Sequence, residues 1–316
     1  MHRRRANDRP NNRINGRMHR RELLQLMGAW SGALAMRALM PRVGNQRAVT
    51  LLLVIQSPRV QTPASTNRDL GITLGIDEAK HAAAMFGGSV ETTTVTADSA
   101  AEVSRAVAAA IGSTRVTALL GGDDVAGCLA LAALASSHDC VHVNVTCPSD
   151  ALRNAECRRR SFHVCPSETM FRDAVSPSSR DETNVTSWHP ALERYGADTL
   201  NRRFESRFNR PMTGEAWCGW IAVKILWESA LRARSVDAGT IIPHLESERA
   251  SFDGHKGRPL GFRPWDHQLR QPVYVERVGA PPVEMPSSTN ADESSRDVLD
   301  RIGTPAGRST CRWTAE

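Results

Sequence analysis

The strongest constraint on this chain is the alternation of apolar, β-branched runs with segments of helical spacing between residues 49 and 145. Short apolar runs bounded by turn residues are typical of buried strands, and strands that alternate with helices form βαβ units with a parallel sheet. We therefore predict an α/β fold, a parallel sheet flanked by helices. The predicted strands span 49–55, 90–96, 116–120 and 141–145, and the predicted helices span 70–86, 98–112 and 125–135.

Small polar residues follow three of these strands. In a parallel α/β sheet, ligands bind at the carboxyl ends of the strands. We predict that Ser57 and Thr146 offer hydroxyl groups to a ligand, Gly122 a backbone amide, and Asp123 a carboxylate for an ammonium or hydroxyl group. Glycine- and serine-rich turns also stand at these positions in α/β proteins without a ligand there, and this alternative stays open.

The second half of the chain has a different pattern. Two long amphipathic helices are predicted, and the second has Trp217 and Trp220 at core spacing. Asp253-Gly254 predicts a tight turn in which His255 and Lys256 are solvated. The predicted helices span 192–208 and 215–234, short strands follow at 260–263 and 273–278, and the aperiodic segment 279–316 is predicted to be a disordered tail.

The charge of the chain is concentrated at one end. Its 316 residues carry a formal net charge of +6, but residues 1–47 contain eleven arginines against Asp8 and Glu22, which leaves −3 for residues 48–316. A slightly acidic body has no general phosphate-binding surface, so we predict no nucleic-acid partner.

The basic head of residues 1–47 resembles an export signal. Arg20 and Arg21 stand directly before an apolar segment that runs to Met40 and contains small residues such as Ala33 and Ala35. A paired arginine before such a segment resembles the twin-arginine type of signal, which predicts a periplasmic protein in a bacterial source. An Arg-rich tail followed by an amphipathic helix is the alternative, and Met18 is a second candidate start.

Catalytic and metal-binding patterns are weak. The sequence has no P-loop, GxSxG, HExxH or GxGxxG motif. Zinc is one use of the crowded Cys/His residues, but no CxxC pair is present, and export favours a disulfide among Cys140, Cys147, Cys157 and Cys165 over zinc or free thiols. We predict no catalytic residue, no metal and no cofactor. The crowded residues are Cys140, His142, Cys147, Cys157, His163 and Cys165.

Three stretches together resemble a known family. They are Asp150–Arg153 with Cys157 and Phe162–Ser167, then Trp217–Lys224, and then Phe252–Gly257 followed by Phe262–Pro272. From about residue 49 to 278 the chain resembles the type I periplasmic solute-binding proteins of the branched-chain amino acid ABC transporter group. It is most similar to the branch that accompanies quinoprotein (PQQ-dependent) alcohol oxidation.

The resemblance implies two αβ lobes around a cleft, hinge closure on a small ligand, delivery to an ABC permease, and no catalysis. Trp188 is then expected as an apolar wall of the ligand site. The family places a second αβ lobe before Trp188, whereas residues 175–187 are polar and too few for a βαβ unit. We therefore predict a truncated, largely helical second lobe. The predicted parts are the head 1–47, lobe 1 at 48–150, a remnant of lobe 2 with returning segments at 151–278, and the tail 279–316.

The resulting hypothesis is the substrate-binding component of an ABC importer for a small organic solute such as an amino acid, an amide or a compound of alcohol metabolism. The main alternative is a degenerate binding-protein module that acts through protein contacts with a periplasmic quinoprotein dehydrogenase system. A metal-assisted hydrolase built on the Cys/His cluster ranks below both. A sugar-repressor-like regulator ranks last, because the head lacks a convincing helix-turn-helix.

Overall fold

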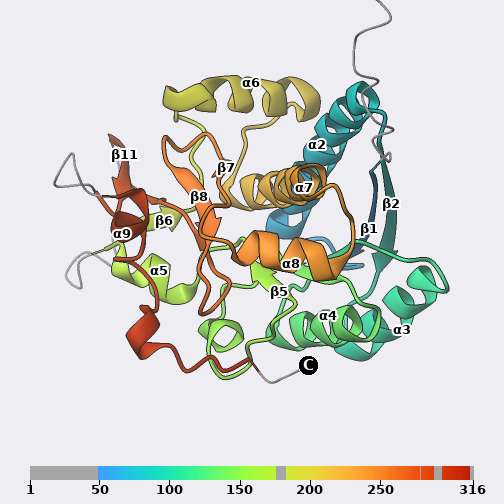
Figure 1. The fold of residues 1–316 in the computed structure, drawn as a ribbon. Helices are drawn as coiled ribbons and strands as arrows, with labels where there is room; N and C mark the ends of the chain where they lie inside the picture. Colours follow the sequence, from blue (N-terminus) through green and yellow to red (C-terminus); the bar gives the residue numbers. More distant parts are fainter. Residues whose placement is uncertain (1–48, 176–182, 278, 288–293, 314–316) are drawn as a thin grey trace, which may run out of the picture. The chain divides into compact units, whose positions relative to one another are not determined.

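Five parallel strands form the central sheet, in the order β2-β1-β3-β4-β5 (Figure 1). The parallel sheet predicted from the alternating pattern is confirmed, and its fifth strand was not predicted. The strands are β1 (Thr50–Ser57), β2 (Ser89–Thr96), β3 (Ala118–Gly121), β4 (Val141–Asn144) and β5 (Ser161–His163).

The computed structural model describes residues 49–175, 183–277, 279–287 and 294–313. The described residues all belong to one compact unit, within residues 48–316. The predicted signal-like head therefore lies outside the described residues. Among the described residues, no helix has the length and apolar character needed to span a membrane.

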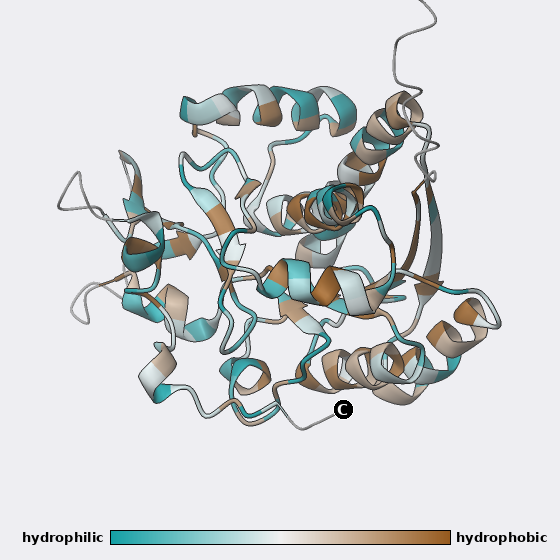
Figure 2. Cartoon of the chain, in the orientation of Figure 1, coloured by the Kyte–Doolittle hydropathy of each residue, from teal (hydrophilic) through white to brown (hydrophobic). Residues whose placement is uncertain are grey.

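Helices cover both faces of the sheet. The apolar side chains of β1 point alternately to the two faces, so that each face has its own core. Leu53 and Ile55 point into a core shared with α2 (Pro63–Phe86), whereas Val54 points into a core shared with α3 (Ala100–Ile111) and α4 (Val125–Ser137). Each helix begins at a side-chain cap, namely Thr62, Ser99 and Asp124. Figure 2 shows the apolar residues along α3, α4 and the long helix α7 (Gly214–Ala233).

Helix α7 (Gly214–Ala233) packs directly on α2, and glycines make this close approach possible. A Cβ atom at Gly71 would lie 1.8 Å from the carbonyl oxygen of Ala216, and one at Gly219 would lie 2.4 Å from that of Arg68. Trp217 and Trp220 on α7 are buried, as their spacing predicted, and the Trp220 indole donates to Glu78 of α2 at 2.8 Å.

The second half holds helices and two small antiparallel sheets, with strand orders β11-β10-β6 and β7-β8-β9. Asn184–Thr186 is a strand where the sequence indicated a loop, and it pairs with β10. Within the described residues, the five-stranded sheet is the one parallel sheet, and the lobe boundary near residue 150 stays a prediction. The elements are η2 (Asp150–Arg153), α5 (Glu168–Asp173), β6 (Asn184–Thr186), η4 (Arg194–Gly196), α6 (Ala197–Phe208), α8 (Ala238–Glu246), β7 (Phe252–Asp253), β8 (Pro259–Phe262), β9 (Leu269–Arg270), β10 (Val273–Arg277), β11 (Ala280–Met285), α9 (Ser295–Leu299) and η5 (Ala306–Arg308).

The prediction of a disordered tail is wrong for its described residues. β11 pairs with β10, and α9 buries Val298 and Leu299. The buried Arg263 donates hydrogen bonds to the carbonyl oxygens of Leu299 (3.1 Å) and Ile302 (2.6 Å). Such short aperiodic elements are stabilised by tertiary contacts, which a pattern search along the chain does not detect.

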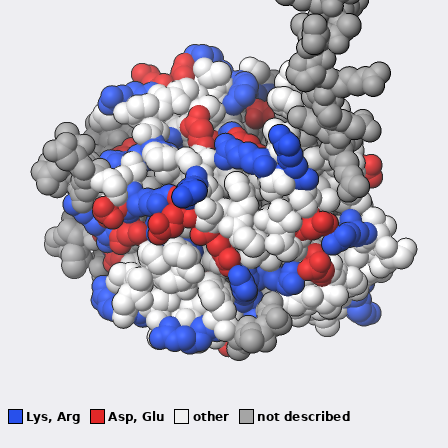
Figure 3. Space-filling view, in the orientation of Figure 1, with Lys and Arg blue, Asp and Glu red and all other residues white. Residues whose placement is uncertain are grey.

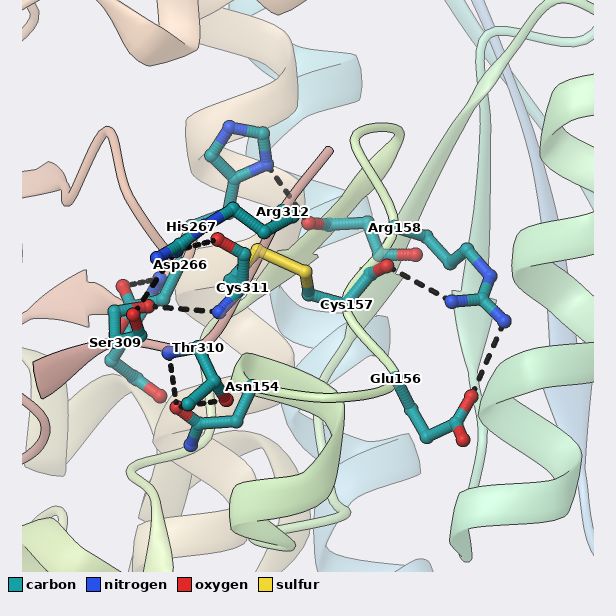
Figure 4. The surroundings of a disulfide bond; sticks show 12 residues. Asn154, Glu156, Cys157, Arg158, Asp266, His267, Ser309, Thr310, Cys311 and Arg312 are labelled. Carbon is teal, nitrogen blue, oxygen red and sulfur yellow. Dashed lines mark hydrogen bonds and ion pairs between the residues drawn. A yellow bond between two sulfur atoms is a disulfide. The ribbon is translucent and has the colours of Figure 1, made fainter. Parts of the chain in front are cut away.

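A disulfide fixes the end of this segment. Cys157 and Cys311 are joined at an S–S distance of 2.06 Å across 154 residues of sequence (Figure 4). The prediction of a disulfide among Cys140, Cys147, Cys157 and Cys165 is therefore wrong: Cys157 does form a disulfide, but its partner is Cys311, in the segment predicted to be a disordered tail. The free cysteines are all buried; they are Cys128, Cys140, Cys147, Cys165 and Cys218.

Candidate functional site

Three of the predicted ligand residues meet at the buried guanidinium of Arg68, at the carboxyl edge of the sheet. Arg68, on α2, pairs with Asp123 after β3 and donates hydrogen bonds to the hydroxyl groups of Thr146 (3.2 Å) and Ser57 (3.5 Å). It also forms an ion pair with Asp69 at 2.8 Å. At this edge, one guanidinium therefore contacts two carboxylates and two hydroxyl groups.

Arg68 itself was missed from the sequence. The predicted helix began at residue 70, whereas α2 begins at Pro63 after the Thr62 cap. Arg68 therefore stands one helical turn before Ile72, in the buried stripe of α2. A charged residue in an apolar helical stripe indicates a buried ion pair, since an unpaired charge there would be costly. A prediction that began this helix at Pro63 would therefore have indicated the buried ion pair of Arg68.

The backbone amide of Gly122 already has a hydrogen-bond partner within the protein. Its φ of 90° lies in the left-handed region, and a Cβ atom there would lie 2.4 Å from the sulfur of Cys128. The Gly122 amide donates to the side-chain oxygen of Gln56 at 2.9 Å. The predicted use of this amide by a ligand would therefore require Gln56 to move.

A small cavity opens beside Thr146. It has a volume of about 180 Å³ and lies between the segments that follow β4 and β5, strand β6 and the start of α7. Thr146 is the one predicted site residue on its wall. The lining residues are Val145, Thr146, Pro148, Cys165, Pro166, Phe171, Val185, Thr186, Ser187, Gly214, Glu215 and Cys218.

The start of α7 brings a carboxylate, that of Glu215, and the positive end of the helix dipole to this cavity. The Thr213 hydroxyl caps the helix by accepting from the Ala216 amide at 3.4 Å, and it donates to Glu215 at 2.7 Å. The positive end of the helix dipole stabilises the Glu215 carboxylate. Gly214 allows the start of α7 to lie close to Ser187, because a Cβ atom at this position would lie 2.7 Å from the hydroxyl oxygen of Ser187.

Trp188 does not lie on the wall of this cavity. Only 1% of its surface is exposed, its ring stacks on Trp217 with 6.1 Å between centroids, and its indole N–H donates to Asn201 at 2.8 Å. The expectation of an apolar wall at Trp188 is thus not supported here. The indole is a core side chain whose single polar atom is already satisfied.

Lys256 was predicted to be solvated, and this is wrong. The side chain is buried, and its ammonium lies 3.6 Å from the ring centre of Trp217. It donates to the carbonyl oxygens of Ser187 (2.6 Å) and Pro272 (3.0 Å) and to the Gln271 side chain (2.9 Å). Burial lowers the pKa of Lys256 to about 7. The turn sequence gave no signal of these distant acceptors.

The Cys/His cluster is dispersed. His142 and His163 are buried, and burial lowers the pKa of His142 to about 4. Cys157 is in the disulfide. Over the part of the chain that the structure describes, no group of three or more His, Cys, Asp or Glu side chains is placed to hold a metal ion.

Solved structures share the fold of this chain. A periplasmic binding protein from Burkholderia mallei matches with a TM-score of 0.65 at 12% identity, over 84% of this chain and 98% of that one. A branched-chain amino acid ABC transporter protein from Rhodopseudomonas palustris matches with 0.64 at 13%, over 82% and 99%. LivJ from Streptococcus pneumoniae, in complex with isoleucine, matches with 0.57 at 12%, over 74% and 99%.

The chain has a type I periplasmic-binding-protein fold. This confirms the predicted fold class, a parallel sheet flanked by helices. No protein-family model matches the sequence, and no curated protein sequence matches it. At these identities, the likeness to periplasmic binding proteins is one of fold.

Proposed function

We propose that this chain is the solute-binding component of an ABC importer. It binds a compact organic solute without transforming it and delivers that solute to a membrane permease. The observation that carries the proposal is the convergence of Ser57, Asp123 and Thr146 at the carboxyl edge of the sheet, beside a cavity. In open α/β sheets this edge is where ligands bind.

The size of the cavity limits the solute. About 180 Å³ equals the volume of about six water molecules, and ligand pockets usually exceed about 300 Å³. A small amino acid, an amide, or a short alcohol or acid fits this space. Solute-binding proteins of the same fold have been solved with isoleucine, benzoate and 4-hydroxybenzoate.

The polar groups at the cavity favour a solute with an ammonium or hydroxyl group. Glu215 lines the cavity, and Thr146 connects it to the Arg68 cluster. Asp123 keeps a third of its side-chain surface exposed even though it is paired with Arg68. A solute that donates hydrogen bonds therefore finds one carboxylate, Glu215, on the cavity wall and a second, Asp123, in the neighbouring Arg68 cluster.

A thermal-shift screen tests the proposal. The panel contains glycine, alanine, isoleucine, small amides, short alcohols, benzoate and 4-hydroxybenzoate. A ligand that binds only the native state raises the melting temperature, and at 100 times its Kd it adds about 2.7 kcal/mol. The Thr146→Val variant is expected to lose this shift. Thr92→Val, at an exposed threonine of edge strand β2, is the matched control and should keep it.

Two results would contradict the proposal. The first is a flat response of the native protein to the whole panel. The second is recovery of a chemically altered solute after incubation with stoichiometric protein, which would indicate an enzyme. Recovery of the unchanged solute supports binding without catalysis.

The small cavity also favours the second candidate, a binding-protein module that acts through protein contacts. A quinoprotein dehydrogenase system is the partner that the sequence suggested. In Figure 3, positive and negative side chains intermix on the face shown, with no extended area of one sign. Co-purification of a quinoprotein with the native chain, together with no response to any solute, would favour this alternative.

Export to the periplasm is part of the proposal and rests on the residues around Arg20 and Arg21. The test is the amino-terminal sequence of protein isolated from the periplasm, which should begin beyond this segment. Arg20→Lys with Arg21→Lys should leave the protein in the cytoplasm if the twin-arginine route is used. Recovery of a chain with intact residue 1 from the cytosol would contradict export.

A further inference from the structure

A second and larger cavity lies in the second half of the chain, on residues that the proposed function does not use. Its volume is about 550 Å³, within the range of about 300–1,000 Å³ that is usual for ligand pockets. Its walls come from η4 and the residues just before it, from the turn between β7 and β8, and from strands β10 and β11. Three parts of the chain that are distant in sequence therefore enclose one space that an organic molecule can enter.

Tyr195 presents an aromatic ring on the wall of this cavity. The residue is 58% exposed, and its φ of 58° lies in the left-handed region, which non-glycine residues rarely adopt. The ring lies against Gly257, where a Cβ atom would lie 2.3 Å from a ring carbon, and the Tyr195 carbonyl oxygen lies 3.1 Å from the Nδ1 atom of His255. Strained backbone persists where the surrounding contacts hold it, and it is concentrated at ligand sites. The exposed ring is therefore a fixed surface on which a planar group can stack.

Tyr274 brings a hydroxyl group to the same cavity. The residue lies on β10 opposite Glu284 of β11, and only 3% of its surface is exposed. Burial, together with the charge of Glu284, raises the pKa of Tyr274, so that the hydroxyl keeps its proton and can donate it in a hydrogen bond. Within the described residues, however, this hydroxyl has no hydrogen-bond partner. A polar group enclosed so deeply is expected to have one, and a ligand in the cavity would supply it.

Positive side chains outnumber carboxylates on the cavity wall. Arg194, Lys256 and Arg258 line it together with two carboxylates, those of Glu193 and Glu284, and three cations against two carboxylates leave one positive charge in excess. Glu284 is already paired with Arg258 at 3.1 Å. The cavity therefore favours an anion over a cation.

The positive charge in excess includes the buried ammonium of Lys256. Its three hydrogen bonds go to neutral acceptors, namely the Gln271 side chain and the carbonyl oxygens of Ser187 and Pro272. An amine that donates three hydrogen bonds is protonated. The ammonium lies 5.5 Å from the ring centre of Tyr274, and across the part of the chain that the structure describes it forms no ion pair with a carboxylate. An anion at Tyr274 would stabilise this buried charge.

We propose that this cavity binds a planar aromatic carboxylate. The carboxylate accepts a hydrogen bond from the Tyr274 hydroxyl near the positive charge of Lys256, and the aromatic ring stacks on Tyr195. The guanidinium of Arg194 lies 5.2 Å from the Tyr195 ring centre and adds a positive charge beside the stacked ring. This site is independent of the proposed importer function, because its wall shares no residue with the cavity at Thr146.

The test is a calorimetric titration of the full native chain with 2-naphthoate. Tyr274→Phe removes only the hydroxyl group and should weaken binding about tenfold. Tyr195→Ala removes the stacking surface and should also weaken binding about tenfold, whereas Tyr195→Phe keeps the ring and is the matched control that should bind as the native chain does. Equal binding by the native chain and by the Tyr195→Ala/Tyr274→Phe double variant would overturn the proposal, as would a flat titration of the native chain.

Two analogues test the role of charge on the native chain, without any substitution. The neutral amide 2-naphthamide and the cation 2-naphthylmethylammonium have the same rings, and each should bind at least about tenfold more weakly than 2-naphthoate. Equal or tighter binding of either analogue would overturn the proposal. Thr146→Val should bind 2-naphthoate as the native chain does, and a loss of binding in this variant would place the carboxylate in the smaller cavity and overturn the site at Tyr195 and Tyr274. A flat solute screen with intact 2-naphthoate binding in Thr146→Val would reject only the importer function.

Discussion

The guanidinium of Arg68 donates a hydrogen bond of 3.2 Å to the hydroxyl of Thr146, and this contact joins helix α2 to the end of strand β4. The same guanidinium pairs with Asp69 and Asp123. Arg68 thus determines how the carboxyl edge of the sheet is organised before any solute arrives. It also limits the charge that a solute meets there.

Replacement of Arg68 by Ala should destabilise the fold. The change leaves two carboxylates and two hydroxyl groups without their common donor. Breaking a buried pair costs about 3–5 kcal/mol, and we expect about 3 kcal/mol here because both carboxylates are partly exposed. Urea unfolding measures the difference. Arg59→Ala, which removes an exposed pair with Asp98, should cost at most about 1 kcal/mol. Equal costs for the two variants would contradict the assigned role.

The α2–α7 interface should not tolerate a side chain at Gly71. An added methyl group would collide with the backbone of Ala216, so that the helices must separate. We expect Gly71→Ala to lower the free energy of unfolding by about 2 kcal/mol or more, in the range of overpacked cores. Gly239→Ala is the control, since nothing lies within 4 Å of its Cβ position on α8, and it should be neutral or stabilising by up to about 1 kcal/mol. A folded Gly71→Ala variant of native stability would rule out this packing.

Glu246 should make stability depend on acid pH. Burial opposes its charge, but the His267 ring nitrogen, 3.2 Å away, and hydrogen bonds from Arg159 at 3.2 Å outweigh burial and lower its pKa to about 2. The unfolded chain then binds more protons between about pH 4.5 and 2. The stabilisation is complete above pH 4.5 and is lost as the pH falls through 2.

The Glu246→Gln variant isolates this effect. It should be less stable than the native chain at pH 6, and the gap should close as the pH approaches 2. Thermal unfolding across this pH range provides the measurement. Glu248→Gln, at a side chain that is mostly exposed, should follow the native curve throughout. A gap between the native chain and Glu246→Gln that does not change with pH would contradict the assignment.

Loss of the Cys157–Cys311 disulfide should lower stability. Closing a loop of 154 residues restricts the unfolded chain, which in the chain-entropy model contributes about 5 kcal/mol. Cys311→Ser should therefore unfold at a lower urea concentration than the native chain, and reductant should shift the native chain in the same direction. Reductant should leave the Cys311→Ser curve unchanged. A native curve that ignores reductant would show that the bond does not form.

The sequence predicted the elements whose pattern is long and regular. Strands β1 to β4 were found because apolar, β-branched runs stood between turn residues. Strand β5 was missed, since Ser161–His163 has three residues and two of them are polar. It pairs with β4 on one side, and on the other side its partner is distant in the sequence: the His163 amide donates to the carbonyl oxygen of His267 at 2.9 Å. Tertiary contacts of that kind leave no mark in the local sequence.

The candidate site divides in the same way. The strand ends placed Ser57, Asp123 and Thr146 at one edge, because parallel topology alone requires this. Trp188 stacks on Trp217 and does not line the cavity, and this contact depends on how the second half packs on α7. Arg68 was not predicted. Its role depends on a helix meeting strand ends that are far away in the sequence.

The bond between Cys157 and Cys311 has a practical consequence for anyone who digests this chain. A protease cut anywhere between these residues opens the backbone but releases no fragment, because the sulfur bridge still connects both pieces. On a gel run without reductant, the nicked molecule would migrate near the intact one. In such a digest, the carboxyl-terminal segment therefore stays attached to the rest of the chain, as an internal loop would.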